Sequence, residues 1–567
     1  MDRSRRIKKS IDMLPAVLYY LISFVLFIIS ILRIVHLNSP SSLPLMIGKW
    51  EVVSFWILSA WLLLAGSFYV FYQVKSYQKI SKRTLVFLIV IFLSGFFLRA
   101  FVAPHTERLY FDEDIYLNIA QNIRSNAQAL SCNNGYVRFG KLHCLQPILN
   151  KEPNGWPFLL SLVLNLASPE KAGRWLSIFL SSLSVLLVFL IGKKLFGDTG
   201  GLWAAFVYSL MPIPIKWAPT VEPNTAFTFF FLGSFYLCLK EADHENCGYL
   251  LFPWLVLTVQ MRPEGILVLP AALLLIFLGK KEFFMERKNL FFWGLSLILL
   301  IPYGIHLFAA RHSHWGSRGP KFSLSYFLPN LAANLRFFIQ PLRFPPLDTF
   351  FFLIGFFTIF MLSKNKRAVY PLILWLIMFF SIYLFFYAGS YNYGVDVRFS
   401  LPIHPVLAIF SAAGILFLCE WFLNRKLNAA PAVFGLLLFG FFFQLSHITI
   451  IGQQGWQARA DHDFITNLAP SLPANAVVFT HDPSEVMDAG RWGVQTFELN
   501  SVYLGHLFKK KEVPYFYFDA WCSTPEFKTQ CKNILKKYKL LPVSENTTLK
   551  QKLILFRIVG GRSHGKD

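Results

Sequence analysis

The sequence predicts an all-α polytopic membrane protein that carries a small α/β domain outside the membrane at its C-terminal end. Hydrophobic residues make up 55% of the 567-residue chain and charged residues only 15%, whereas a soluble protein carries about 25% charged residues. Apolar runs near helical span length recur from Met13 to Ile451, and roughly 20 such residues cross a bilayer core as a helix. Residues 452–567 are more polar and contain short strand-like runs.

We predict about thirteen transmembrane helices, with boundaries good to a few residues. The first apolar run follows a basic start and has no small-residue cleavage site after it, so we expect a retained helix whose N-terminus is cytoplasmic. The predicted spans are 13–35, 53–72, 84–102, 174–192, 200–218, 222–239, 249–261, 264–279, 290–309, 348–362, 369–388, 400–421 and 430–451.

The distribution of basic residues supports this count. Most loops predicted inside are basic, as the positive-inside rule requires, and one, 240–248, is acidic and breaks the trend. The net charge of +23 therefore indicates membrane topology and anionic ligands, not nucleic acid. An odd count places the C-terminus outside. The basic inner residues are Lys75, Lys79, Lys82, Arg83, Lys193, Lys194, Lys280, Lys281, Arg287, Lys288, Lys364, Lys366, Arg367, Arg425 and Lys426.

This topology divides the chain into three predicted domains. Residues 1–83 form a cytoplasmic tail and two additional helices, 84–451 form a transmembrane catalytic region, and 452–567 form an extracytoplasmic α/β domain. The catalytic region has two long outer loops, 103–173 and 310–347. Within the first, 112–124 has the periodicity of an amphipathic helix, with Tyr116, Ile119, Ala120 and Ile123 on one face. In the last domain, 476–480 and 553–559 are predicted strands.

Four cysteines lie in the predicted outer segments. Cys132 and Cys144 share the first outer loop, and Cys522 and Cys531 share the C-terminal domain. An oxidising compartment favours a disulfide within each pair, and the alternative is a chance pairing of free thiols.

Two motifs in the first outer loop could support chemistry. Asp112-Glu113-Asp114 begins the amphipathic helix, and a carboxylate there can act as a general base or ligate a metal. The alternative is acids that stabilise a helix N-terminus. Lys151 opens a Pro/Gly turn where its ammonium could hold a phosphate, while the following Trp156 is expected at the membrane interface. The alternative for this turn is simple interfacial anchoring.

Two further segments join spans on the outer side. Glu222 begins a span, and an acid in an apolar hairpin is costly without a partner or a function. Arg398 lies at the lip of another span, where a guanidinium suits bidentate contact with a phosphate. The alternatives are a headgroup-exposed acid and a snorkelling arginine. The second outer loop contains no acid from Ala310 to Leu347 but several cations, which favours an anionic ligand there: Arg311, Arg318, Lys321, Arg336 and Arg343.

The order of these motifs resembles the membrane glycosyltransferase superfamily of the GT-C type, which includes protein O-mannosyltransferases and the lipid A aminoarabinose transferase. The resemblance covers roughly 84–451. Its elements are Asp-Glu-x-x-Tyr (Asp112, Glu113, Tyr116), a Lys-Pro-Pro-like turn lacking its first Pro (Lys151-Glu152-Pro153), an acid after the second outer hairpin (Glu222, where Asp is common), Arg-Pro-Glu-Gly at 262–265, and Arg-Phe-x-x-Pro-x-x-Pro (Arg398, Phe399, Pro402, Pro405).

The resemblance implies an enzyme that transfers a monosaccharide, mannose-like or related, from a polyprenyl-phosphate donor to a protein, lipid or glycan acceptor, with inversion. Asp112 is then the base, with Glu113 and Tyr116 orienting it or the acceptor. Arg398 and Lys151 would stabilise the phosphate, and Arg262 and Glu222 would bind substrate. The expected place is the outer face of a plasma or inner membrane. No cofactor is certain, and a divalent metal remains an alternative.

Two other functions compete with this interpretation. A transporter or flippase for a lipid-linked sugar would place ionisable residues near the middle of the membrane and show repeated halves. An inactive scaffold would retain the fold without needing both Asp112 and Arg398. The tryptophan-rich signature of oligosaccharyltransferases, Trp-Trp-Asp-Tyr-Gly, is absent from the sequence, which favours transfer of a monosaccharide over a whole oligosaccharide.

Overall fold

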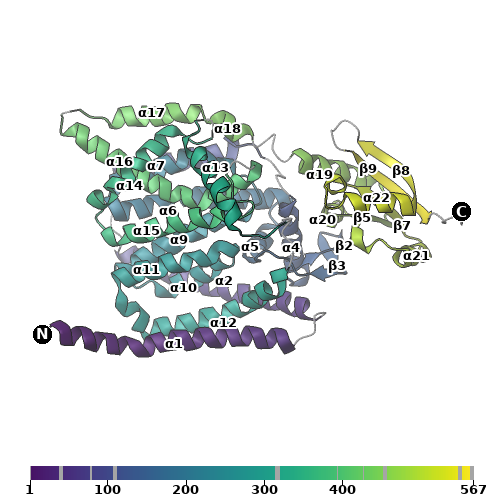
Figure 1. The fold of residues 1–567 in the computed structure, drawn as a ribbon, viewed down its shortest axis with the longest axis horizontal. Coiled ribbons are helices and arrows are strands. Elements are labelled where there is room, and N and C mark those ends of the chain that lie inside the picture. Colours follow the sequence, from purple (N-terminus) through teal and green to yellow (C-terminus); the bar gives the residue numbers. More distant parts are fainter. Residues whose placement is uncertain are drawn as a thin grey trace.

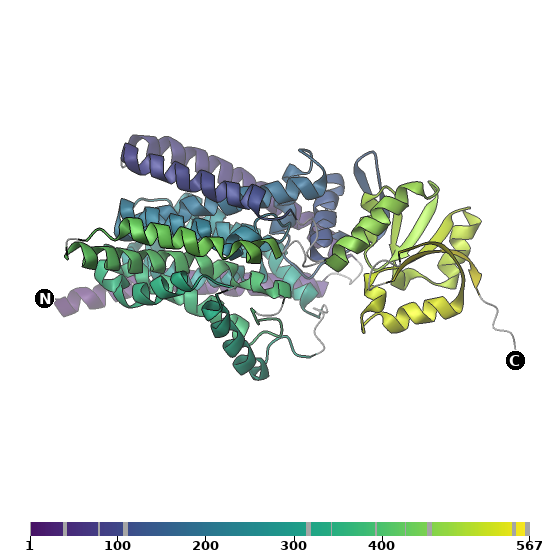
Figure 2. The same cartoon turned by 90° about the horizontal axis from the view of Figure 1, so that it is seen from above.

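Long helices form one bundle, and a unit containing a β-sheet lies beyond one end of it (Figure 1). The computed structural model describes residues 2–37, 42–76, 80–105, 111–312, 319–341, 343–391, 394–425, 427–450, 456–546 and 552–561. Of the basic residues that entered the topology and ligand predictions, Lys79, Arg318 and Lys426 lie outside these ranges. Figure 2 shows from above that the N-terminus and the sheet-containing unit lie at opposite ends.

Among the described residues, each predicted span coincides for most of its length with helix. Two of them are broken: 200–218 is divided at Met211 and 430–451 at residues 443–444. The helices of the membrane part are α1 (Asp2–Leu37), α2 (Leu43–Ser76), α3 (Lys82–Phe97, continued by a π-helical turn, Leu98–Val102), α6 (Pro169–Phe196), α7 (Asp198–Leu210), α8 (Pro212–Lys216), α9 (Pro223–Ala242), α10 (Gly248–Val259), α11 (Val268–Gly279), α12 (Arg287–Ala309), α14 (Pro346–Leu362), α15 (Lys366–Leu384), α16 (His404–Leu423), α17 (Ala430–Phe442) and α18 (Leu445–Thr449).

The protein is a multi-pass membrane protein. Among the described residues, seven helices are long and apolar enough to cross a membrane, and four shorter apolar helices accompany them. Several of the predicted spans form only short helices. A helix rises about 1.5 Å per residue, so the 13 residues of α7 cover about 20 Å. The count of thirteen crossings therefore stays a prediction.

The acidic inner loop that broke the charge trend is neutralised by its neighbours. Lys194 Nζ lies 2.8 Å from Asp243 Oδ2 and 2.7 Å from Glu245 Oε1. Lys280 Nζ lies 2.6 Å from Glu241 Oε1. These lysines belong to other loops predicted inside, so the acidic loop lies among them at one end of the bundle.

The centre of the bundle is formed by α6, α7, α9, α14 and α16. Close approach of α14 to α16 depends on two glycines, since a Cβ at Gly355 would collide with the Phe410 carbonyl and one at Gly414 with the Phe351 carbonyl. Small residues allow such backbone approach between membrane helices. The two additional helices at the N-terminus pack at one edge, α1 against α12 and α2 against α12 and α10.

The sheet is shared between the first outer loop and the C-terminal domain. Strand order is β3-β2-β6-β5-β7-β9-β8, and the hairpin β2–β3 comes from the outer loop. Gly135 of β2 pairs antiparallel with Gly493 of β6, while β5 runs parallel to both β6 and β7. The strands are β2 (Asn134–Arg138), β3 (Lys141–Cys144), β5 (Ala476–Thr480), β6 (Trp492–Gln495), β7 (Val513–Phe518), β8 (Tyr538–Asn546) and β9 (Leu553–Gly561).

Shorter elements complete the outer end. In the first loop these are α4 (Asp112–Asn126), β1 (Ser131–Cys132), β4 (Pro147–Ile148) and α5 (Gly155–Val163), and the second loop carries α13 (Phe327–Ile339). The C-terminal helices are α19 (Trp456–Leu468), α20 (Pro483–Asp488), α21 (Ser501–Lys509) and α22 (Lys528–Lys537). The two expected disulfides are present, Cys132–Cys144 and Cys522–Cys531.

The start of α1 and the sheet-containing unit lie at opposite ends of the bundle. This placement predicts an extracytoplasmic C-terminus, because an odd number of crossings carries the chain from one side to the other. A reporter fused after Asp567 that fluoresces only in the cytoplasm should stay dark. The same reporter fused after Lys75, behind the second span, should be bright. Fluorescence from the Asp567 fusion would contradict the odd count.

Candidate active site at the outer end of the bundle

The N-terminus of α4 brings its acids to the end of the bundle that carries the sheet. The predicted apolar face of this helix is buried, as Tyr116, Ile119, Ala120 and Ile123 all show, and α4 packs against α5. Burial raises the pKa of Tyr116 well above its usual value, and nearby carboxylates add to the effect. Tyr116 therefore stays protonated beside the acids.

Arg398 is the centre of the site. It lies in a 3₁₀ segment, Gly394–Ile403, immediately before α16. Its Nη1 lies 3.0 Å from Glu222 Oε1, and its Nη2 lies 3.4 Å from Asp112 Oδ2. The Glu222 side chain is 1% exposed and that of Asp112 29%. Arg398 is thus held firmly by the buried Glu222 and loosely by the more accessible Asp112. Glu222 and Arg398 are therefore paired with each other and not exposed among lipid headgroups.

Glu113, which was expected to orient Asp112 or the acceptor, contacts the backbone of another segment. Its Oε2 accepts the Val221 N–H at 3.1 Å, and Trp156 Nε1 donates to the Val221 carbonyl at 2.6 Å. Both the N–H and the carbonyl of Val221 therefore have partners, which fixes the backbone directly before Glu222. The expectation for Trp156 was wrong: it is completely buried, because its N–H finds this carbonyl inside the protein and needs no headgroup.

A second arginine has its own carboxylate. Arg262 Nε and Nη2 contact the two carboxylate oxygens of Glu264 at 3.1 and 2.9 Å. Tyr383 donates from its hydroxyl to Glu264 Oε1 at 2.7 Å. The guanidinium carbons of Arg262 and Arg398 lie 5.5 and 5.3 Å from the centre of the Phe399 ring. One aromatic ring thus links the two arginines.

The Lys151 turn docks on the segment that carries Arg262. The Gly155 N–H donates to the Gln260 carbonyl at 3.0 Å, and a Cβ at Gly155 would collide with that carbonyl. Burial raises the pKa of Glu152 in this turn, against the opposing positive charges of Arg262 and Lys151. Partial burial and the charge of Lys151 lower the pKa of Lys321, so one cation of the second outer loop lies near this turn.

A buried network ties the same turn to the N-terminal helices. His306 of α12 contacts Glu51 of α2, with 2.8 Å from Nδ1 to Oε1. The other ring nitrogen of His306 lies 2.7 Å from the Asn150 carbonyl. Asn154 donates from Nδ2 to Glu51 Oε2 at 2.6 Å and to the Ala129 carbonyl at 2.9 Å. These contacts hold both ends of the segment that carries Lys151.

The predicted site residues are therefore distributed over neighbouring contacts. Asp112, Glu222 and Arg398 form one group, Arg262 is paired with Glu264, and Glu113 supports the first group through the backbone. Sequence reasoning missed Glu264 and Tyr383 as partners. The Arg-Pro-Glu-Gly motif contained a signal for Glu264, whereas a tyrosine near the end of a span resembles an interfacial anchor.

Asp114 faces the C-terminal domain instead of Arg398. Its carboxylate and those of Asp482 and Glu485 all lie within 4.8 Å of one another, and all three residues are buried. Carboxylates are the ligands that hard divalent cations prefer. Among the described residues, this is the carboxylate group whose spacing suits such an ion.

A family comparison supports the resemblance that the motifs predicted. Residues 151–306 match the family model described as dolichyl-phosphate-mannose-protein mannosyltransferase. The matched segment includes Lys151, Glu222 and Arg262. It confirms the resemblance to membrane glycosyltransferases of the protein mannosyltransferase type. No curated protein matches the chain.

Three solved structures to which the chain is similar are distant in sequence. The archaeal oligosaccharyltransferase AglB from Archaeoglobus fulgidus, in complex with an inhibitory peptide and a dolichol-phosphate, is 14% identical with a TM-score of 0.48, over 81% of this chain and 73% of that one. ArnT from Cupriavidus metallidurans, bound to undecaprenyl phosphate, is 12% identical with a TM-score of 0.49, over 84% and 97%. Arabinosyltransferase EmbB from Mycobacterium smegmatis is 14% identical with a TM-score of 0.33, over 68% and 43%.

The buried network predicts that Glu51 supports the Lys151 turn from a distance. Glu51→Ala should lower stability by roughly 3–5 kcal/mol, because it removes the carboxylate that contacts His306 Nδ1 and accepts one of the two N–H groups of Asn154 in a buried place. Glu51→Gln keeps the shape and should cost less. Thermal unfolding of the purified variants measures this, with the exposed neighbour Lys49→Ala as the control. Equal melting of Glu51→Ala and wild type would contradict the assignment.

Proposed function

We propose that the protein transfers a monosaccharide from a polyprenyl-phosphate donor to a hydroxyl acceptor at the outer face of the membrane, with inversion. The observation that carries the proposal is the group formed by Asp112, Glu222 and Arg398, where an accessible carboxylate lies beside a guanidinium. The family match over residues 151–306 supports the donor class, since its description names a lipid-phosphate-linked sugar.

The donor phosphate would bind at Arg398. Its contact with Asp112 is long at 3.4 Å, compared with 2.7–3.2 Å for a good N–H···O bond. A phosphate oxygen can therefore take this place while Glu222 keeps hold of the other side of the guanidinium. Lys151 and Lys321 add positive charge nearby. These cations stabilise the charge on the departing phosphate.

Asp112 would act as the general base. The acceptor oxygen attacks the anomeric carbon, its proton passes to the Asp112 carboxylate, and the bond from the anomeric carbon to the phosphate oxygen breaks with its electron pair remaining on the phosphate. A phosphate is a good leaving group, so no general acid is needed. A single displacement inverts the anomeric centre. Glu113 fixes the backbone that presents Glu222.

Arg398 should be required for use of the donor. A charge-assisted contact to phosphate is worth roughly 1.5–3 kcal/mol, so Arg398→Ala should lower kcat/KM for the donor by about tenfold or more. Arg398→Lys should restore only part of this, because the planar fork is lost. Transfer from a synthetic polyprenyl-phosphate sugar measures the effect, with the exposed Arg138→Ala as the control. An unchanged donor dependence in Arg398→Ala would refute the phosphate assignment.

The three adjacent acids should differ in their effect on turnover. Asp112→Asn removes the proton acceptor and should lower turnover by about 10²–10⁴-fold while donor binding stays nearly intact. Glu113→Gln should do less, since an amide oxygen can still accept the Val221 N–H. Asp114→Asn should do least, because its carboxylate lies with Asp482 and Glu485.

The same purified variants in the transfer assay decide between catalysis and a helix-end role. If these acids only complement a helix N-terminus, each substitution should lower stability by about 0.3–1 kcal/mol, with no selective loss of turnover. Equal and mild effects at Asp112, Glu113 and Asp114 would therefore overturn the assignment of the base.

A further inference from the structure

A cavity of about 400 Å³ lies between the first outer loop and the C-terminal domain. Its size falls within the roughly 300–1,000 Å³ of small-molecule sites. Aromatic side chains line it from both parts of the chain, namely Phe111, Phe497, Trp521 and Phe527. Side-chain amides lie between them, among them Asn118, Asn150 and Gln530. Of its lining residues, only Lys151 takes part in the proposed reaction.

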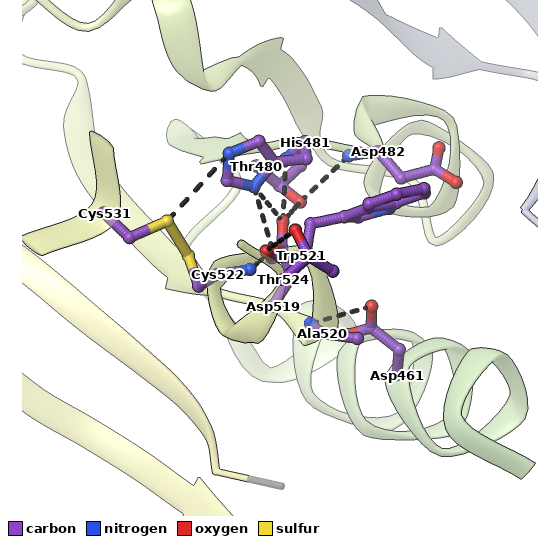
Figure 3. The surroundings of a disulfide bond; sticks show 10 residues. All are labelled: Asp461, Thr480, His481, Asp482, Asp519, Ala520, Trp521, Cys522, Thr524 and Cys531. Atoms are coloured by element: carbon purple, nitrogen blue, oxygen red, sulfur yellow. Dashed lines mark hydrogen bonds and ion pairs between the residues drawn. A yellow bond between two sulfur atoms is a disulfide. The ribbon is translucent and has the colours of Figure 1, made fainter. Parts of the chain in front are cut away.

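The wall of the cavity that the C-terminal domain supplies contains Trp521, whose neighbours in the chain make several hydrogen bonds (Figure 3). On one side, the Asp519 carboxylate accepts hydrogen bonds from the Thr480 hydroxyl at 2.9 Å and the His481 N–H at 2.8 Å. It also accepts the Cys522 N–H at 3.2 Å, and Cys522 is in turn bonded to Cys531.

On the other side, the Ala520 N–H donates to Asp461 Oδ2 at 3.2 Å. The backbone on both sides of Trp521 is therefore fixed, and this indole needs little ordering when a ligand arrives.

The opposite wall of the cavity connects directly to the proposed base. Phe111, Ile115 and Asn118 line the cavity, and their spacing of four and three residues places them on one face of α4. Asp112 follows Phe111 and contacts Arg398 on the adjoining face. The Phe111 ring lies 4.4 Å from the Trp521 ring, centre to centre. Asp112 does not itself line the cavity, but its chain neighbour Phe111 does, so the cavity borders the proposed base at this residue.

The lining suits a saccharide. A sugar ring has an apolar C–H face that stacks on aromatic rings and hydroxyls that both donate and accept hydrogen bonds, as side-chain amides do. Asn150 is 8% exposed, and its Nδ2 has no hydrogen-bond partner among the described residues. Lys151 and Asp482 contribute one charge of each sign to the lining, so a neutral ligand fits better than a strongly charged one.

A peptide fits this cavity less well. Extended peptides are commonly bound by adding a strand to a free sheet edge. The edge strands of this sheet are β3 and β8, and neither contributes to the lining. Strand addition to this seven-stranded sheet is therefore not offered in the cavity.

We infer that this cavity is the acceptor site and that the acceptor is a saccharide, seated on Trp521 with its reactive hydroxyl directed toward Asp112. The inference rests on the proposed function, the transfer of a monosaccharide to an acceptor hydroxyl. It adds the class of acceptor and the residues that bind it. The C-terminal domain then supplies the acceptor site, while the bundle supplies the donor site.

Binding of methyl hexosides and hexose disaccharides to the full-length purified protein tests this inference without turnover. Saturation-transfer NMR should detect saccharide binding to wild type and to Asp112→Asn. Trp521→Ala should weaken it about tenfold, and Gln530→Ala and Trp521→Phe should weaken it less. Phe139→Ala, at a ring that is 92% exposed on the β2–β3 hairpin, should leave it unchanged. Melting temperatures close to that of wild type show that these variants are folded.

Transfer assays separate this inference from the proposed function. Trp521→Ala should raise the acceptor KM about tenfold, and Gln530→Ala should raise it less. The donor KM should be unchanged in both variants. Equal saccharide binding by wild type and both cavity variants overturns the inference, and so does binding of a serine-containing hexapeptide instead of the saccharides. Either result leaves the Asp112 reaction standing if Asp112→Asn still lowers turnover by about 10²–10⁴-fold. Full transfer by Asp112→Asn with saccharide binding lost in Trp521→Ala would refute the proposed function alone.

Discussion

The ion pair of Arg398 with Glu222 is the constraint on which the outer end of this protein depends. Both side chains are buried, with Nη1 and Oε1 3.0 Å apart, and removing one partner of such a pair leaves a costly unpaired charge. The pair joins the start of α9 to the segment before α16, and Asp112 joins α4 to the same guanidinium. Segments up to 286 residues apart in the chain thus meet at one charged group.

The charges at this end are balanced locally. Arg262 has Glu264, Arg398 has Glu222 and Asp112, and Glu152 lies near Arg262 and Lys151. The site therefore does not depend on free cations waiting for a phosphate. In the proposed reaction, an arriving phosphate would exchange with the loosest of these contacts, the 3.4 Å approach of Asp112. This exchange would release the Asp112 carboxylate for the acceptor when the donor binds.

Much of the fold could be predicted because its signals are local. Apolar runs gave the helices, and the periodicity of 112–124 gave the buried face of α4. The paired cysteines gave both disulfides. Pairing between distant segments carries no such signal. The match of Gly135 with Gly493, the burial of Trp156 and the lysines that neutralise 240–248 all depend on tertiary contacts.

The candidate site was predictable in its residues but not in its partners. The motifs and the predicted topology put Asp112, Glu222 and Arg398 on the same side of the membrane. Which carboxylate contacts each arginine could be seen only in the folded structure. A double-mutant cycle of Glu222→Gln and Arg398→Gln in the transfer assay tests the central claim most directly. If Glu222 acts by holding Arg398, the double variant should be no slower than Arg398→Gln alone, within about twofold. Losses that multiply would show that the two residues act independently and would contradict this account.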